Sequence, residues 1–433
     1  MFPFFPVAMD VAQQASFQTR AEERLRTGND VDAEETELQP QLRYDFIWER
    51  GEDHFVAIYN PRLIYTHTFK RPAPNPADPA TQNVADPNDT PLSTLHNGGL
   101  ALEIVRPRYR FAAYQFGAYG PITTTALLVH APWIGEGPPP DPVAIIPSTI
   151  AARFTLLFLQ TQILLPIKVS RRVAVTPQLT YNAFGGATDE SRGVIPETYG
   201  PGASLSLEAD ATRSDRLTTS IGAGTVNTVF QGGATGDTIY RAEGMQAWRH
   251  YYSRNVYTEA LAGISFAYDA VNRSSYYPLL SAGVLYDSYP FVRVEPGAQA
   301  QAPLPAHGDH VQFALIAKAA PWIDLFSGDL EERVLGITAV NYITGQTTLR
   351  AQLGVGVNAF NKAVVGPLDN KAVPNYQIVE IEAGVRYAVA PTFSIDGGLR
   401  FGYQDFTNVV RASQVTQETV YAGLTWAPLP ARF

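Results

Sequence analysis

Long segments of this sequence alternate apolar and polar residues one by one. In residues 348–360, the apolar positions are Leu349, Ala351, Leu353, Val355, Val357 and Ala359. The same pattern recurs in residues 203–212, 378–389 and 393–404. A period of two is typical of a β-strand whose two faces meet different surroundings. The sequence therefore predicts an all-β protein.

The length of these alternating runs indicates a membrane rather than a soluble environment. They extend over about 11 to 14 residues, whereas strands of soluble proteins average about 5–6 residues. A tilted strand that crosses a bilayer needs about 9–11 residues. Charged residues make up only 17% of the chain, and a soluble protein carries about 25%. We therefore expect one antiparallel transmembrane β-barrel in a bacterial outer membrane; a soluble secreted β protein, such as an adhesin, is the alternative.

Connections of two lengths separate the predicted strands. Tight turns are predicted near residues 50–52, 106–107, 170–171, 213–215, 253–254, 343–345 and 390–391. Longer polar stretches are predicted at 70–95, 125–147, 185–198, 231–242 and 361–373. Outer-membrane barrels have short periplasmic turns and long extracellular loops. The stretch 288–308 is an exception, because it is long where a short turn is expected.

Parity then sets the strand number. With the short turns on one side, the chain must begin with a weakly patterned strand within residues 11–24, and the total is 18 strands. Sixteen is the alternative if two weak strands are excluded. We expect residues 1–10 to form an apolar segment outside the fold, like a signal remnant, and residues 11–433 to form the barrel.

The polar faces of the strands predict a hydrated lumen with charges of both signs. The predicted lumen-lining residues are Arg43, Asp45, Arg62, Glu208, Asp210, Arg350, Glu380, Glu382, Arg386, Asp396 and Arg400. Opposite charges on neighbouring strands also stabilise a sheet, so the same residues can form ion pairs and line the lumen. A lumen of balanced charge suits a neutral or weakly charged polar solute, such as a glycan.

One pair of strands allows a prediction of register. If residues 390–392 form the turn, Arg386 lies opposite Asp396 and Glu382 lies opposite Arg400. A slip of four residues would set Glu382 against Asp396, and like charges opposite each other destabilise a sheet. The charge pattern therefore favours the first register.

Other classes of function find little support. The net charge of −9 argues against a nucleic-acid partner, because phosphate contacts need a basic face. The absence of cysteine excludes disulfides and thiolate sites. We find no nucleophile elbow and no zinc-protease helix motif, so we expect a protein that is not an enzyme and needs no cofactor. His307 with His310, and Asp78 with Asp86 and Asp89, are better explained as solvated turns than as metal ligands.

Several short segments resemble a family of large bacterial outer-membrane β-barrels. They are residues 42–48, 60–63, 215–219, 248–250, 277–279 and 330–334, and the resemblance extends over about residues 11–433. Some members of this family are similar to the 18-stranded porins associated with exopolysaccharide export. The resemblance implies outer-membrane lipid around the barrel, and a periplasmic or outer-membrane polysaccharide-export protein as partner. It implies no oligomeric state.

The expected function is therefore a passive conduit for a polar solute, with secreted polysaccharide as the expected cargo. Eighteen strands enclose a lumen wide enough for an aqueous channel, with a backbone diameter of roughly 35 Å. The alternatives are a general or substrate-specific nutrient porin and a surface-anchoring or adhesive barrel.

Overall fold

A computed structural model of the chain provides the fold. It describes residues 10–28, 32–70, 92–123, 153–193, 195–236, 238–270, 274–288, 296, 310–323, 330–343, 347–358, 375–407, 414–428 and 431–432. The predicted apolar segment at residues 1–10 lies outside this description except for its last residue, and Phe433 also lies outside.

The described chain is almost entirely β-strand. In the first half, the strands are β1 (Asp10–Gly28), β2 (Asp32–Arg50), β3 (Asp53–Tyr59), β4 (Arg62–Lys70), β5 (Leu92–Val105), β6 (Arg110–Thr123), β7 (Arg153–Leu164), β8 (Ile167–Ser170), β9 (Val173–Gly186) and β10 (Glu197–Asp210). They continue with β11 (Asp215–Val229), β12 (Ile239–Tyr251), β13 (Val256–Asp269), β14 (Ser274–Asp287), β15 (His310–Ile323) and β16 (Leu330–Ile343). The last are β17 (Thr347–Asn358), β18 (Asn375–Ala390), β19 (Phe393–Thr407), β20 (Gln414–Trp426) and β21 (Ala431–Arg432). Two short helical turns, α2 (Asp189–Arg192) and η2 (Gln231–Gly233), lie in connections.

These segments form 18 wall strands, because three wall strands are interrupted. Segments β3 and β4 both pair with β2 and β5, segments β7 and β8 both pair with β9, and segments β20 and β21 both pair with β1. Proline lies at all three breaks, as Pro61, Pro166 and Pro428, where its missing N–H cannot join the ladder. The structure therefore confirms 18 strands rather than 16.

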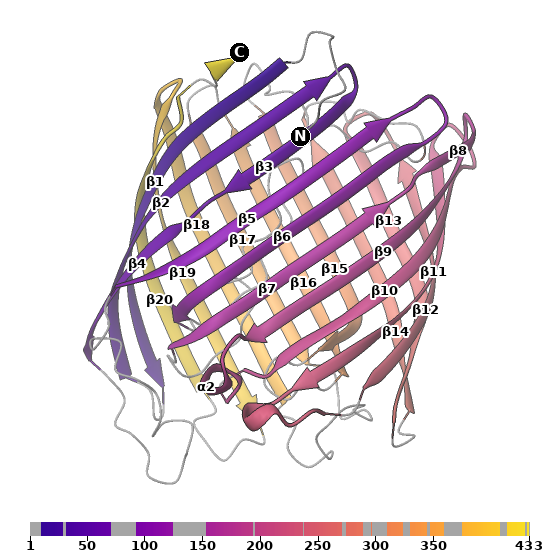
Figure 1. The fold of residues 1–433 in the computed structure, drawn as a ribbon. Coiled ribbons are helices and arrows are strands. Elements are labelled where there is room, and N and C mark those ends of the chain that lie inside the picture. The colour runs from indigo at the N-terminus through magenta and orange to yellow at the C-terminus, as the bar shows by residue number, and fades with distance from the viewer. Residues whose placement is uncertain are drawn as a thin grey trace.

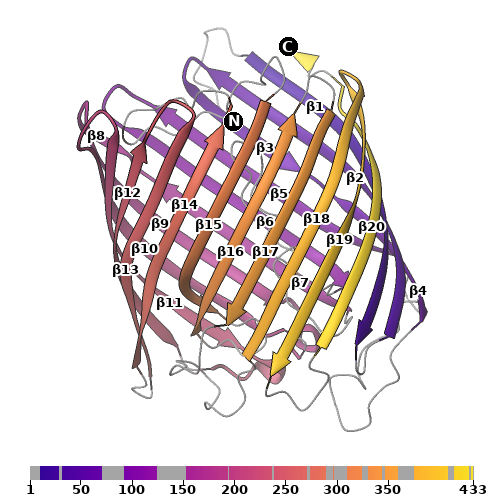
Figure 2. The same ribbon diagram turned by 180° about the vertical axis from the view of Figure 1, so that it is seen from behind.

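The barrel closes where the first strand meets the last. Each wall strand is antiparallel to its neighbour, and β1 pairs with both β2 and β20. Figures 1 and 2 show the steeply tilted wall, with the start of β1 and the short β21 at the same end of the barrel. Followed once around the barrel, the registers shift by about 22 residues, which corresponds to a tilt of about 40° and a backbone diameter of about 36 Å.

The predicted register of β18 and β19 is confirmed. Arg386 pairs with Asp396, and Glu382 pairs with Arg400. The turn that joins these strands contains Pro391 and Thr392. Charge complementarity across the two strands was therefore sufficient to define the hairpin.

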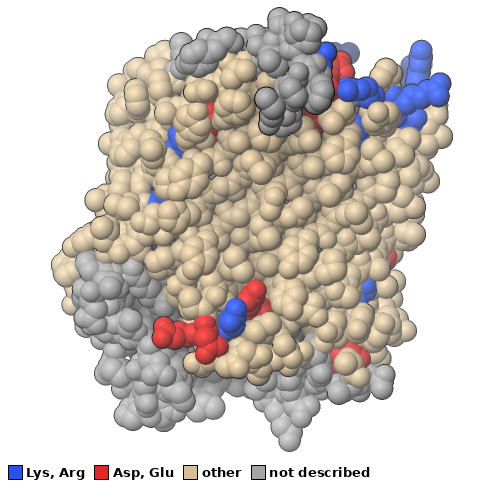
Figure 3. Space-filling model, in the orientation of Figure 1, with Lys and Arg blue, Asp and Glu red and all other residues tan. Residues whose placement is uncertain are grey.

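The two faces of the wall differ as the alternation predicts. Large apolar side chains project outward, with Leu205 and Leu207 44% exposed and Leu399 60% exposed. Figure 3 shows a broad central band of this outer surface in which charged side chains are sparse, with most of them near the two ends. The opposite face carries buried charged residues, among them Glu22, Arg24, Glu37, Glu103 and Arg216. Such an inverted distribution is that of a barrel in lipid. Among the described residues, no helix combines the length and the apolar character needed to cross a bilayer.

Short and long connections segregate to the two ends, with exceptions. Tight turns at residues 51–52, 171–172 and 391–392 lie at the end that also holds the start of β1 and the short β21. The connections that contain α2 and η2 lie at the other end. Only three residues separate β1 from β2 at that long-loop end. The predicted long stretches 70–95 and 125–147 fall largely outside the described residues, as does 288–308.

Candidate functional site

The inner wall formed by β1, β2 and β18–β20 carries a network of ion pairs, which we call the ionic wall. At its centre, the Arg24 guanidinium lies 2.7 Å from the Glu37 carboxylate and also contacts Glu22. The Arg20 Nε lies 2.6 Å from the Glu22 carboxylate. The side chains of Arg24, Glu22 and Glu37 are only 6–7% exposed. Burial is tolerated because each charge has a partner of opposite sign.

The network continues onto the last strands. The Arg400 guanidinium lies 3.4 Å from the Glu382 carboxylate, and the Tyr421 hydroxyl donates a hydrogen bond of 3.2 Å to the same carboxylate. The Arg20 guanidinium lies 3.9 Å from the centre of the Tyr421 ring, as in a cation–π contact. The ionic wall therefore bridges the seam at which β1 meets β20.

The structure brings several of the predicted lumen residues together as charged pairs. Arg43 and Asp45 on β2 are 2.9 Å apart. On β10 and β11, Glu208 and Asp210 each lie 2.8 Å from Arg216. Glu382 and Arg400 join the ionic wall described above.

The remaining predicted residues are less closely associated. Arg386 donates a hydrogen bond of 3.1 Å to Ser394, and its backbone lies opposite Asp396. Arg62 on β4 has its backbone opposite Gln41. The backbones of Arg350 and Glu380 lie opposite Gly384 and Gly402, and their side chains are outside the described set. That these eleven residues line a solute path stays a prediction.

The most deeply buried charged residues of β1 and the adjoining part of β2 were not among the predicted residues. Glu22, Arg24, Glu35 and Glu37 lie on β1 and β2, where the apolar face is poorly developed in the sequence. A signal was present in the pairing of acidic and basic residues at every second position from Arg20 to Arg26. That signal becomes readable only once β1 is known to pair with β2.

An apolar patch interrupts the polar inner face near the long-loop end. Leu95, Phe154 and Leu156 occupy inward positions and are at most 3% exposed. Ile195, from the connection that contains α2, is fully buried against them. Backbone hydrogen bonds from Ala187 to Thr155 and from Gly186 to Ile195 hold this connection on the wall. The α2 connection therefore covers the patch.

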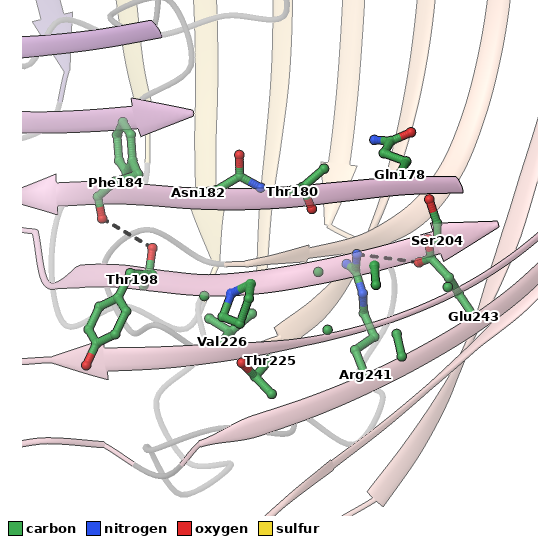
Figure 4. A pocket seen from close by; sticks show the side chains of 18 residues that line it. Gln178, Thr180, Asn182, Phe184, Thr198, Ser204, Thr225, Val226, Arg241 and Glu243 are labelled. Atoms are coloured by element: carbon green, nitrogen blue, oxygen red, sulfur yellow. Dashed lines mark hydrogen bonds and ion pairs between the residues drawn. The ribbon is translucent and has the colours of Figure 1, made fainter. Parts of the chain in front are cut away.

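A recess of about 390 Å³ lies on the inner wall formed by β9–β12. Figure 4 shows its labelled polar side chains, which come from these four neighbouring strands. The residues that matter below are Gln178, Thr180, Asn182, Ser204, Arg241 and Glu243. We call this recess the groove. On a closed barrel of 18 strands, β11 lies half-way round from β20, so the groove faces the ionic wall.

The tyrosines of β12–β14 and of the connection after β12 are divided between the two faces of the wall. Tyr252 and Tyr276 are exposed on the outer face, at 64% and 63%. Tyr277 is fully buried on the inward face of β14, and Tyr251 pairs with Tyr257 on the same inward face. Period-two parity separates the two groups, so neighbours such as Tyr251 and Tyr252 have opposite environments.

No cluster of metal-ligating residues occurs in the part of the chain that the structure describes. His307, Asp78, Asp86 and Asp89 lie outside that part, and His310 begins β15. That these residues form solvated turns rather than metal ligands stays a prediction.

A closed antiparallel barrel with an apolar outer belt and a charged inner wall defines the class of outer-membrane β-barrel proteins. The sequence profile of the EpsX exopolysaccharide export family matches residues 130–356, just over half of the chain. The chain belongs to this exopolysaccharide export family. No curated protein matches it.

Solved structures of bacterial outer-membrane proteins are similar in fold. OpdK of Pseudomonas aeruginosa, solved with vanillate, shares 10% identity and has a TM-score of 0.46, with 96% of this chain and 99% of that chain covered. OccK9 (OpdG) of the same species also has 10% identity and a TM-score of 0.46, with 96% and 98% covered. OccAB4 of Acinetobacter baumannii shares 9% identity at a TM-score of 0.43, with 96% and 98% covered. At these scores the likeness adds nothing to the fold that the strand pairings themselves define.

Proposed function

We propose that this barrel is a passive conduit through which secreted polysaccharide crosses the outer membrane. The observation that carries the proposal is a polar, charge-balanced inner wall enclosed by 18 strands in a member of an exopolysaccharide export family. A barrel of this size leaves an aqueous interior, as a hydrated polymer requires.

The chemistry of the inner wall supports a glycan as the cargo. Its charged residues are largely neutralised within the wall, as in the pairs of Arg24 with Glu37 and of Arg216 with Asp210. A paired charge presents no net field to select a cation or an anion, but it still offers hydrogen-bonding groups. The eleven predicted residues contribute to this lining in the proposal.

A barrel has no access to a nucleotide as energy source, so the driving force for export must come from elsewhere. We propose that a periplasmic or outer-membrane polysaccharide-export protein delivers the polymer to the short-turn end. The tight turns at residues 51–52, 171–172 and 391–392 keep the rim low where they lie, which would let a partner approach the lumen there. The surrounding lipid meets the apolar outer belt.

The test combines export in cells with conductance of the purified barrel. We expect deletion of the gene to abolish extracellular polysaccharide and the wild-type gene to restore it. In planar bilayers, the purified barrel should conduct small ions, and polysaccharide from the same strain should reduce that current. Undiminished polysaccharide after deletion, together with uptake of small solutes through an open pore, would instead establish the nutrient porin. Neither conductance nor an export defect would leave an anchoring or adhesive role.

A further inference from the structure

The floor of the groove is formed by glycines. Gly200 and Gly202 on β10 and Gly222 and Gly224 on β11 all occupy inward positions, and Gly202 lies directly opposite Gly224. A Cβ at Gly224 would lie 3.0 Å from the Pro201 carbonyl oxygen, and a Cβ at Gly202 would lie 2.7 Å from the Thr180 hydroxyl. The recess therefore exists because no side chain rises from the floor.

The ladder between β10 and β11 is interrupted at this floor. Pairing runs from Glu197 to Tyr199 and resumes at Gly202, so that Gly200 and Pro201 have no partner residue on β11. Pro201 has no N–H to contribute to the ladder, and a Cβ at Gly200 would lie 1.8 Å from the Thr225 carbonyl oxygen, so β10 and β11 approach closely at this point without paired residues.

One flank of the groove is a row of uncharged polar side chains. Gln178, Thr180 and Asn182 are the successive inward residues of β9. The structure gives none of these three side chains a hydrogen bond to another described residue. Because alternate residues on a strand repeat every ~6.6–6.8 Å, the row offers donors and acceptors at regular intervals along the wall. Asn182 is exposed, and Gln178 and Thr180 are half-buried.

The other flank carries a neutralised charge pair. On β12, the Arg241 guanidinium lies 3.4 Å from the Glu243 carboxylate, as Figure 4 shows. Phe184 lies at the end of the groove nearest the α2 connection and adds an apolar surface. The groove thus combines amides, hydroxyls, a charge pair without net charge and one aromatic ring.

We propose that the groove is a binding subsite for neutral sugar units of the exported chain, an inference that rests on the proposed function. Sugar hydroxyls would bond to the row on β9 and to the Arg241–Glu243 pair, and the C–H face of a ring would lie on the glycine floor and against Phe184. Each contact is weak, because a hydrogen bond made in water adds little net free energy. A polymer can therefore advance along the wall without being trapped.

The absence of cysteine from the chain makes a direct test possible. Ser204 lines the groove on β10, and Gln41 lies on the inward face of β2, beside the ionic wall. The variants Ser204→Cys and Gln41→Cys would be reacted with a small cationic methanethiosulfonate. The probe is a set of short oligosaccharides from partial hydrolysis of the host strain's own extracellular polysaccharide, and polyethylene glycol of equal size controls for mere exclusion.

We expect the oligosaccharides to slow labelling at S204C by about tenfold when present at ten times their dissociation constant, with little slowing at Q41C. The triple change Gln178→Leu, Thr180→Val and Asn182→Leu, made in the S204C background, should abolish that protection. If the triple variant does not show the faster gel migration of an unheated, folded barrel, Asn182→Leu alone replaces it and should weaken the protection.

Three results would overturn the subsite: equal slowing at both cysteines, equal slowing by polyethylene glycol, or protection that survives the changes on β9. None of these results touches the conduit itself, because the deletion experiment measures export independently. Loss of export on deletion together with unprotected Ser204→Cys would leave the conduit standing and remove the subsite.

Discussion

Replacement of Arg24 by methionine should be among the most damaging single changes to this barrel. Arg24 is the cation that separates Glu22 on β1 from Glu37 on β2, and these two carboxylates lie directly opposite each other across the strands. Methionine fills a comparable volume but removes the positive charge. Two buried carboxylates would then face each other, and Glu37 would lose its 2.7 Å ion pair.

The expected cost follows from the geometry. Side chains directly opposite on antiparallel strands have Cβ atoms about 5 Å apart. Two like charges at about 5 Å repel by about 3 kcal/mol at an effective dielectric constant of about 20. Mutations that leave a buried charge uncompensated cost about 3–5 kcal/mol. We therefore expect the free energy of unfolding to fall by about 4 kcal/mol in the Arg24→Met variant, the middle of the range for such mutations.

The assay is urea unfolding of the purified barrel in detergent, followed by the loss of fast gel migration. Arg20→Met is the matched control, because Glu22 keeps Arg24 as a partner; its cost should be about 1–2 kcal/mol. The triple variant Glu22→Gln, Arg24→Met, Glu37→Gln should recover most of the loss, because it removes the two facing carboxylates together with the guanidinium that separates them. Equal costs for Arg24→Met and Arg20→Met, or no recovery in the triple variant, would refute the reasoning.

Two further predictions concern the backbone and a turn. Gly200→Ala should cost about 3 kcal/mol or more, because its Cβ would lie 1.8 Å from the Thr225 carbonyl oxygen, whereas Gly244→Ala, with nothing within 4 Å, should change the unfolding temperature little. At the short-turn end of the wall, where Asp215 begins β11, hydrogen bonds from Thr212, His250 and Trp248 lower the pKa of Asp215 to about 2 from 3.8. The carboxylate therefore stabilises the fold above about pH 4, and this contribution is lost as the pH falls towards about 2; Asp215→Asn should flatten the pH dependence of unfolding in that window, and an unchanged slope would contradict the assignment.

The alternation of apolar and polar residues was enough to predict the fold, because each strand of a barrel in lipid has one face towards lipid and one face towards the aqueous interior. Residues 378–389 and 393–404 needed only their own pattern and four charges to give the observed register. The strand number followed from turn spacing and parity. The weakly patterned first strand proved to be one of the two longest described strands, at 19 residues. Its apolar pattern is weak because its pairing with β2 relies on charge.

The groove and the apolar patch could not be predicted in the same way. Alternation assigns a residue to a face but not to a neighbour, and the groove requires four strands in register. Gly202 and Gly224 meet through the pairing of β10 with β11, and this hairpin has no set of complementary charges opposite each other at the glycines to define its register from sequence. Inward leucines such as Leu95 and Leu156 contradict a uniformly wet interior, and Ile195 explains them only after the α2 connection is placed.

Most of the entropic cost of closing the barrel arises in one step, the pairing of β1 with β20 at the seam. Apart from this seam, neighbouring wall strands follow one another in the chain, so they can pair as soon as each hairpin forms. The seam joins residues such as Phe17 and Trp426 through twelve residue pairs. For a flexible chain of some 400 residues, bringing such ends together costs about 5 kcal/mol in entropy. Closure is therefore the last event, and a chain that stops short of β20 would present two open strand edges, a known route to aggregation.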